Sequence, residues 1–195
     1  VSIELAAMDV SSYEDSERAI GEIADKYGAV DILVNCAGIT RDGTLKKMPE
    51  ANWKAVMATN LDSAFNTTRH VINGMLEKGW GRIVNIASVN GQRGQFGQAN
   101  YSAAKAGMHG FTMAVALETA AKGITVNTVS PGYIATPMTE AMPEKVLEAI
   151  VNSVPMRRMG TPEEIANTVA WLASEGNGYT TGANIPVNGG LFTSH

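Results

Sequence analysis

The chain has 195 residues, of which 45% are apolar and 17% charged, an ordinary composition for a single globular domain over residues 1–195. Its net charge of −4 provides no basic surface for a nucleic acid, and no apolar run approaches the ~20 residues of a membrane-spanning helix. Cys36 is the single cysteine, which excludes an intrachain disulfide and suits a cytoplasmic location. The three histidines are scattered without metal-ligand spacing, so we predict no metal site.

Apolar periodicity and capping residues predict strands that alternate with helices. The first strand covers residues 3–8, and Ser11 or Ser12 caps a helix that ends at Gly28. The other predicted strands cover residues 31–34, 82–87, 124–129 and 183–187. The other predicted helices cover residues 50–78, with a bend near Asn60, then 100–122, and then a segment that starts at Thr161-Pro162. A loop-and-helix insertion is predicted over residues 132–159.

This alternation predicts an α/β fold with a Rossmann-like, doubly wound parallel sheet. Such a dinucleotide-binding fold opens with a strand, a Gly-rich turn and a helix whose N-terminus holds the pyrophosphate. No turn of that kind precedes Asp9. We therefore expect the sheet to lack the N-terminal Gly-rich βαβ portion, which leaves neighbouring strands without partners. The Gly-rich run over residues 91–97 lacks the Gly-x-Gly start, and a substrate-facing loop fits it better.

Three residues indicate a proton-donating site. Tyr101 and Lys105 lie four positions apart in a predicted helix, so their side chains share one face. An ammonium beside a phenol favours phenolate, and we expect Lys105 to lower the pKa of Tyr101 from its usual value of ~10. Ser88 ends a predicted strand and can bond the same substrate oxygen as Tyr101. The alternatives are an exposed helix pair and a serine that caps a helix or turn.

Further segments match in order on both sides of this site. They are Asp9-Val10, Asn35-Cys36-Ala37-Gly38, Thr59-Asn60-Leu61, Pro131-Gly132 with Thr136, and Asn188-Gly189-Gly190. Together with Ser88, Tyr101 and Lys105, they resemble the short-chain dehydrogenase/reductase family over nearly the whole chain. Stretches over residues 37–42, 79–85, 89–98 and 130–136 are most similar to the acetoacetyl-CoA reductases of that family, and next to its 3-oxoacyl-carrier-protein reductases.

The resemblance implies a role for each catalytic candidate. Tyr101 would be the general acid, Ser88 would orient and polarise the carbonyl, and Lys105 would also bind the nicotinamide ribose. Asn60 would use its backbone carbonyl to hold a water that relays protons to Lys105. The alternative for Asn60 is a buried asparagine that bridges strands or kinks a helix.

The resemblance also implies binding residues. Contacts to NADPH, with NAD left open, would come from Asp9, Val10, Asn35, Ala37, Gly38, Ile39, Tyr101, Lys105, Pro131, Gly132, Ile134 and Thr136. Contacts to the substrate would come from Asp42, Ser88, Gln95, Phe96, Gln98, Tyr101, Gly132 and Tyr133. Cys36 departs from the family, which usually has a second asparagine there. The alternatives are that Asp9 caps the following helix and that residues 91–98 form a mobile polar loop.

The implied activity is NADPH-dependent reduction of a 3-oxoacyl thioester. The most similar subgroup implies reduction of acetoacetyl-CoA to (R)-3-hydroxybutyryl-CoA for polyhydroxyalkanoate synthesis. One alternative is 3-oxoacyl-carrier-protein reduction in fatty acid synthesis. An alternative of another class is a non-catalytic fragment that acts only in assembly. The family further implies a homotetramer that packs the helices over residues 50–78 and 100–122, with neither a nucleic acid nor a membrane as partner.

Overall fold

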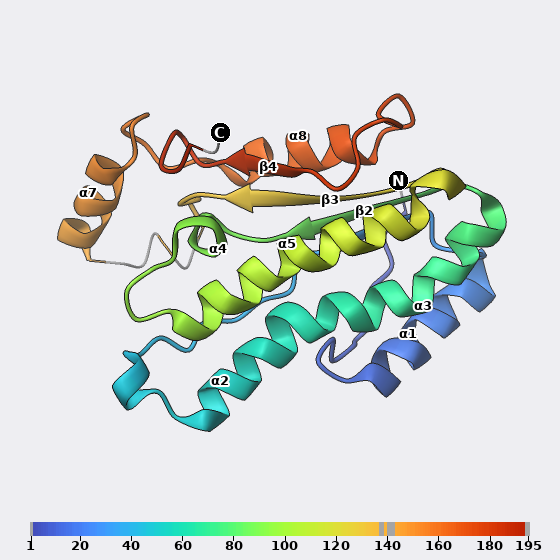
Figure 1. Cartoon of the computed structure of the whole chain (residues 1–195), viewed down its shortest axis with the longest axis horizontal. Coiled ribbons are helices and arrows are strands. Elements are labelled where there is room, and N and C mark those ends of the chain that lie inside the picture. The colour runs from blue at the N-terminus through green and yellow to red at the C-terminus, as the bar shows by residue number, and fades with distance from the viewer. Residues whose placement is uncertain (1, 137–138, 140–142, 194–195) are drawn as a thin grey trace.

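The computed structural model describes residues 2–136, 139 and 143–193. Its strands form one parallel sheet in the order β1-β2-β3-β4 (Figure 1). The strand bounds are Ile32–Asn35, Gly81–Ile86, Ile124–Pro131 and Asn184–Val187. The four strands lie within two residues of the positions predicted from the sequence, and the parallel sheet with intervening helices confirms a Rossmann-like α/β fold.

Helices cover both faces of this sheet. Helices α3, Ser63–Lys78, and α5, Ala99–Thr119, lie over one face, and α8, Pro162–Ala173, lies over the other (Figure 1). Successive strand residues point to opposite faces, so Ile83 of β2 packs with Met75 of α3 whereas Val84 packs with Leu172 of α8. Because the strands are parallel, their carboxyl ends meet at a single edge of the sheet.

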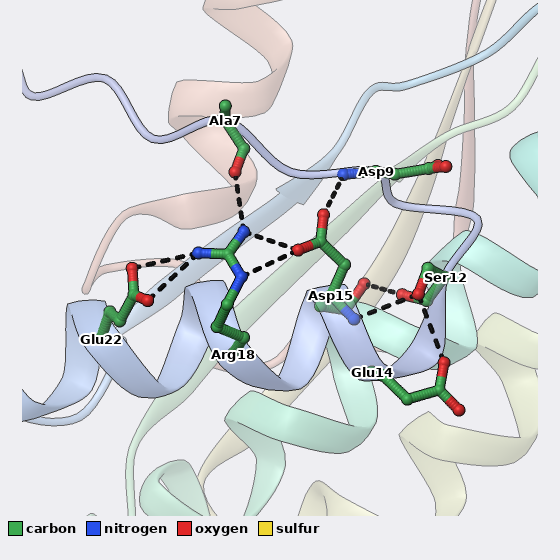
Figure 2. A network of polar contacts seen from close by, with 8 residues as sticks. Ala7, Asp9, Ser12, Glu14, Asp15, Arg18 and Glu22 are labelled. Carbon is green, nitrogen blue, oxygen red and sulfur yellow. Dashed lines mark hydrogen bonds and ion pairs between the residues drawn. The ribbon is translucent and has the colours of Figure 1, made fainter.

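Helix α1, Tyr13–Tyr27, has the predicted start and end. The Ser12 hydroxyl accepts a hydrogen bond from the Asp15 amide, and Gly28 ends the helix with a φ of 85°. The strand predicted over residues 3–8 is wrong, because the structure assigns no strand to these residues and places them along α1. Arg18 helps to hold them there, since its guanidinium donates to the Ala7 carbonyl oxygen at 3.2 Å while it pairs with Asp15 and Glu22 (Figure 2).

The long helix predicted over residues 50–78 is present in three parts. Helix α2, Glu50–Met57, continues through a π-helical segment, η2, Ala58–Asp62, into α3. A π-helical turn carries an extra residue and interrupts the regular hydrogen-bond ladder. It occupies the place where the sequence predicts a bend, and Asn60 lies fully buried within it.

Short elements follow the strands at the carboxyl edge. The 3₁₀ turn η1, Leu45–Lys47, follows β1, and helix α4, Val89–Arg93, follows β2. Between α5 and β3, the 3₁₀ turn η3, Ala120–Lys122, extends the helical run of α5. Helix α7, Glu144–Ser153, lies in the predicted insertion, of which residues 137–138 and 140–142 fall outside the described residues.

Helix α8 starts as its sequence predicts. The Thr161 hydroxyl accepts from the Glu164 amide, and the Glu164 carboxylate accepts from the Thr161 amide, which completes a capping box. Within residues 2–136, 139 and 143–193, the structure contains no helix that is both long and apolar enough to cross a membrane.

Candidate active site

Ser88, Tyr101 and Lys105 come together at the carboxyl edge of the sheet. Ser88 follows the end of β2, and Tyr101 and Lys105 occupy the first two turns of α5. The Lys105 side chain is buried, and its Nζ donates to the Ile86 carbonyl oxygen at 2.7 Å. The same nitrogen lies 5.9 Å from the centroid of the Tyr101 ring. The i, i+4 spacing thus places the cation on the phenol's side of the helix, as the sequence predicts.

Ser88 has two relationships that the sequence offered as alternatives. Its Oγ accepts from the Asn90 amide at 3.1 Å and so caps α4. Its side chain also lies beside the Tyr101 phenol, where it favours the phenolate and acts to lower the phenol pKa. A hydroxyl that accepts at a helix cap keeps its O–H free to donate, so the two roles are compatible.

Burial controls the pKa of Tyr101. The phenol pKa lies above its ordinary value of 10.0, because burial disfavours phenolate more strongly than Ser88 favours it, and the Asp42 carboxylate adds to the rise. The prediction that Lys105 leaves this phenol with a lowered pKa is therefore wrong for the chain alone. A neutral phenol is the proton-donating form, so a raised pKa keeps Tyr101 loaded with its proton.

The pKa of Lys105 is lowered, because burial disfavours the charged form of a cation as well. Burial lowers the pKa of its ammonium from 10.5 to about 8, and the Coulomb interaction with Cys36 opposes this fall. One turn further along α5, burial and then the Lys105 charge lower the pKa of His109. Lys105 is thus a cation that any added negative charge nearby would stabilise.

Asn60 uses its side chain to fix the loop after β1. Its Oδ1 accepts from the Ile39 amide at 2.8 Å, and its Nδ2 donates to the Ile39 carbonyl oxygen at 2.9 Å. A Cβ added to Gly38 would lie 3.5 Å from Asn60 Oδ1 and 3.6 Å from Lys105 Nζ. Gly38 and Ile39 therefore lie against the catalytic candidates. The Asn60 side chain joins η2 to the loop after β1 and does not bridge strands, whereas its burial in a π-helical segment agrees with the alternative of an asparagine at a helix irregularity.

The first group of predicted cofactor residues surrounds a cavity beside the end of β1. The cavity holds about 110 Å³ and is lined in part by Val10, Asn35, Cys36 and Ala37. Asp9 precedes it, and its carboxylate accepts from the amide and hydroxyl of Ser11. Asp9 thus orders the turn before α1, while Ser12 provides the cap, so Asp9 is not the capping residue of α1.

The second group follows β3. The Gly132 amide donates to the Val187 carbonyl oxygen at 2.9 Å, and a Cβ on Gly132 would lie 2.8 Å from the Asn188 Cα. Pro131, Gly132 and Ile134 therefore pass close to the end of β4, where only glycine fits at position 132. Thr136 sits further along, with its hydroxyl 3.3 Å from that of Thr139.

The predicted substrate residues divide into two sets. Gln95 and Phe96 are exposed, and Tyr133 lines a cavity of about 290 Å³ beside the end of β4. Gln98, by contrast, is engaged within the protein: its Oε1 accepts from Asn90 Nδ2 and its Nε2 donates to Asp42 Oδ2, both at 3.0 Å. One donor and one acceptor of this amide thus tie the loop after β1 to the loop before α5.

Sequence reasoning missed Asn90 and Asn100. Asn100 is fully buried, its Oδ1 accepts from the Tyr101 amide at 2.8 Å, and its Nδ2 donates to the Arg41 carbonyl oxygen at 3.0 Å. It therefore fixes the backbone of Tyr101 against the loop that carries Asp42. An asparagine in the first turn of a helix is a recognisable capping signal, but its long-range partner has no local signature.

Comparison with known proteins identifies the family to which this chain belongs. A family model described as "Enoyl-(Acyl carrier protein) reductase" matches residues 2–192. The chain belongs to the short-chain dehydrogenase/reductase family, a class of oxidoreductases.

Individual relatives are close. The acetoacetyl-CoA reductase of Allochromatium vinosum is 65% identical over 184 residues, which cover 94% of this chain and 75% of that protein. The acetoacetyl-CoA reductase of Cupriavidus necator is 57% identical, with 94% and 74% covered. The 3-oxoacyl-[acyl-carrier-protein] reductase of Vibrio cholerae is 49% identical, with 95% and 76% covered.

Proposed function

We propose that this protein reduces a 3-oxoacyl thioester with NADPH, and that its substrate is acetoacetyl-CoA, which gives (R)-3-hydroxybutyryl-CoA for polyhydroxyalkanoate synthesis. The observation that carries the proposal is the meeting of Ser88, Tyr101 and Lys105 at the carboxyl edge of the sheet. The substrate is supported by the 65% identity to a relative named acetoacetyl-CoA reductase.

In the proposed reaction, a nicotinamide held at this site would supply the hydride for the substrate carbonyl carbon. The Tyr101 phenol donates its proton to the carbonyl oxygen, and the Ser88 hydroxyl donates a hydrogen bond to that same oxygen. The Lys105 ammonium stabilises the phenolate that results. Asn60 contributes a backbone carbonyl that holds a water on the proton path to Lys105.

The residues present fit a nicotinamide nucleotide. The Lys105 ammonium has three N–H groups, of which the Ile86 carbonyl takes one, so it can also donate to ribose hydroxyls. Gly38 brings backbone without a side chain to this position. We assign the remaining contacts to the two cofactor groups described above, namely Asp9, Val10, Asn35, Ala37 and Ile39, and Pro131, Gly132, Ile134 and Thr136.

The proposal extends to assembly. Phe65 of α3 and Met113 and Leu117 of α5 are large apolar side chains that stay exposed on the helices over one face of the sheet. Their exposure supports a homotetramer in which α3 and α5 pack against partner subunits, and we propose that this tetramer is cytoplasmic. The domain is proposed to be one unit over residues 1–195.

A second candidate substrate is a 3-oxoacyl group on a carrier protein, which the 49% identity to the Vibrio cholerae enzyme supports. The ratio of kcat/KM for acetoacetyl-CoA to kcat/KM for acetoacetyl-carrier protein separates the two. We expect a ratio above one. A ratio well below one favours the carrier-protein substrate.

The main test follows NADPH oxidation by the complete gene product with acetoacetyl-CoA. Tyr101→Phe should lower kcat by about 10²–10⁴-fold, because the general acid is lost. Tyr179→Phe is the matched control, since Tyr179 is fully exposed, and it should keep the wild-type rate. NADPH binding without turnover would refute the substrate, and absence of both binding and turnover would favour a non-catalytic role in assembly.

A further inference from the structure

Five polar side chains, of which four are buried and Asn35 is half-buried, form a continuous hydrogen-bonded row across the sheet, just below the catalytic candidates. We call this row the polar ladder; its members, in order, are Thr67 of α3, Asn35 of β1, Asn85 of β2, Thr112 of α5 and Thr128 of β3. The four links between side-chain atoms measure 2.7, 2.8, 2.8 and 2.8 Å. The ladder therefore joins two helices and three strands.

The ladder lies in an apolar layer, where an unpaired polar group is costly. Asn85, Thr112 and Thr128 are each at most 1% exposed, and the surrounding side chains of this face form two hydrophobic clusters. A hydroxyl or amide in such a place needs partners of its own within the protein. The Thr112 hydroxyl oxygen provides a partner for two buried donors at once, since it accepts from Asn85 Nδ2 and from Thr128 Oγ1.

Hydrogen bonds constrain α5 in a way that apolar packing does not. Apolar side chains tolerate small shifts and repacking, whereas two directional bonds to one hydroxyl hold only in a narrow range of positions. The bonds from Asn85 and Thr128 thus fix both the height of α5 along the sheet and its rotation about its own axis.

This constraint is placed where it affects the catalytic candidates. Thr112 lies two helical turns beyond Lys105 on the same face of α5. Asn85 directly precedes Ile86, whose carbonyl oxygen accepts from the Lys105 ammonium. The ladder and the Lys105 bond therefore fasten α5 to consecutive residues of β2.

We propose that the polar ladder is a positioning device for the reaction, and that Thr112 is the positioning residue through which the sheet sets the placement of Lys105 and Tyr101. The kinetic part of this proposal rests on the proposed function. The structural part does not, because the burial of Lys105 can be measured without turnover.

The test compares Thr112→Val with Thr112→Ser and Thr119→Val. Valine is close to threonine in volume but leaves Asn85 Nδ2 and Thr128 Oγ1 without their partner, whereas serine keeps the hydroxyl. Thr119 is the matched control, because it is equally buried on the same helix two turns further from the site and its hydroxyl donates to the Val115 carbonyl of that helix.

Two readouts are needed. Thr112→Val should lower kcat about tenfold with little change in KM, the size expected when the two hydrogen bonds to Thr112 no longer hold the catalytic groups in place. The pKa of Lys105, followed by NMR of its side-chain nitrogen, should rise from about 8 toward 10.5, because burial is what lowers it. The ionisable groups facing Lys105 are Tyr101 and His109 on α5 and Cys36 after β1, and none of them is substituted in any variant.

Thr112→Ser and Thr119→Val should match the wild type in both readouts. A Thr112→Val protein that unfolds at a lower temperature but keeps the wild-type kcat and Lys105 pKa would overturn the proposal, since the ladder would then serve stability alone. If Thr112→Val does not fold, Thr128→Val removes the other bond to Thr112 and is judged by the same readouts. If the wild type does not reduce acetoacetyl-CoA, the proposed function fails. The Lys105 pKa in Thr112→Val then still tests whether the polar ladder positions Lys105.

Discussion

The Lys105 ammonium and the Ile86 carbonyl oxygen lie 2.7 Å apart, so the second turn of α5 is fastened to the last residue of β2. The bond offsets part of the cost of burying a cation, yet the pKa of Lys105 still falls to about 8. Burial is therefore the larger effect. The protein keeps an incompletely compensated buried charge at the place where the proposed reaction needs one.

Lys105→Met should raise the free energy of unfolding at pH 7 by up to about 3 kcal/mol, because the methionine removes a buried charge. The folded-state pKa is about 8 and the unfolded value is 10.5, so the cost is full below pH 8 and fades as the pH rises toward 10.5. Urea unfolding of both proteins at pH 7 and pH 9.5 checks this. The difference between their free energies of unfolding should be smaller at the higher pH. An unchanged difference would contradict the lowered pKa of Lys105.

Gly91→Ala should lower the free energy of unfolding by about 1–3 kcal/mol and reduce turnover, because it overpacks the contact between α4 and α5. The added Cβ would lie 2.7 Å from the Lys105 carbonyl carbon and 2.9 Å from the Ala106 nitrogen, and neither backbone atom can yield. Gly21→Ala is the control, since nothing lies within 4 Å of its Cβ position in α1, and it should stabilise by about 0.5–1 kcal/mol. Relative to the wild type, the melting temperature should fall for Gly91→Ala and rise for Gly21→Ala.

Gln98→Glu should destabilise the protein by about 1 kcal/mol, since it places a carboxylate where the amide now donates to Asp42 at 3.0 Å. Adding Asp42→Asn should restore most of the loss, because the asparagine amide can donate to the new glutamate. A double-mutant cycle by chemical denaturation measures the coupling. Additive effects of the two substitutions would show that the bridge between the loops does not form in solution.

Glu164→Gln should lower the melting temperature near neutral pH and have less effect in acid. Hydrogen bonds from Arg158 and then from the Thr161 amide lower the pKa of the Glu164 carboxyl from 4.5 to about 2. Its contribution is therefore full above pH 4.5 and is lost as the pH falls toward 2. Melting curves of both proteins at pH 7 and pH 3 should show a smaller difference at pH 3, and a difference independent of pH would rule out the ion pair.

Local patterns predicted a large part of this molecule. The spacing of Tyr101 and Lys105, the capping residues Ser12 and Thr161, and the interruption near Asn60 each involve neighbours within one or two helical turns. Those features depend on helix geometry and on side chains that act on their own backbone, so they can be recognised in a single sequence. The strand predicted over residues 3–8 failed because a strand also needs a partner, which short-range patterns do not specify.

The remaining features arise from contacts between distant segments. The raised pKa of Tyr101 depends on how deeply the phenol is buried, and on Asp42, which lies far from it in the sequence. Gln98 could not be assigned as a bridge, because its partner in the loop after β1 is set by the packing of both loops. The polar ladder draws its members from five separate elements and leaves no periodic pattern of its own.

The π-helical segment η2 also sets the phase between two halves of one continuous helix. Each residue of an α-helix turns about 100° around the axis, so the extra residue in Ala58–Asp62 rotates everything before it relative to α3 by roughly that angle. A deletion of a single residue here would restore a regular helix and rotate α2 so that the Asn52 carbonyl oxygen, which accepts from Asn100 Nδ2 at 3.4 Å, turns away from the start of α5. The length of this segment is therefore fixed by the fold, and apart from Asn60, whose side chain binds Ile39, substitutions should be tolerated there far better than deletions.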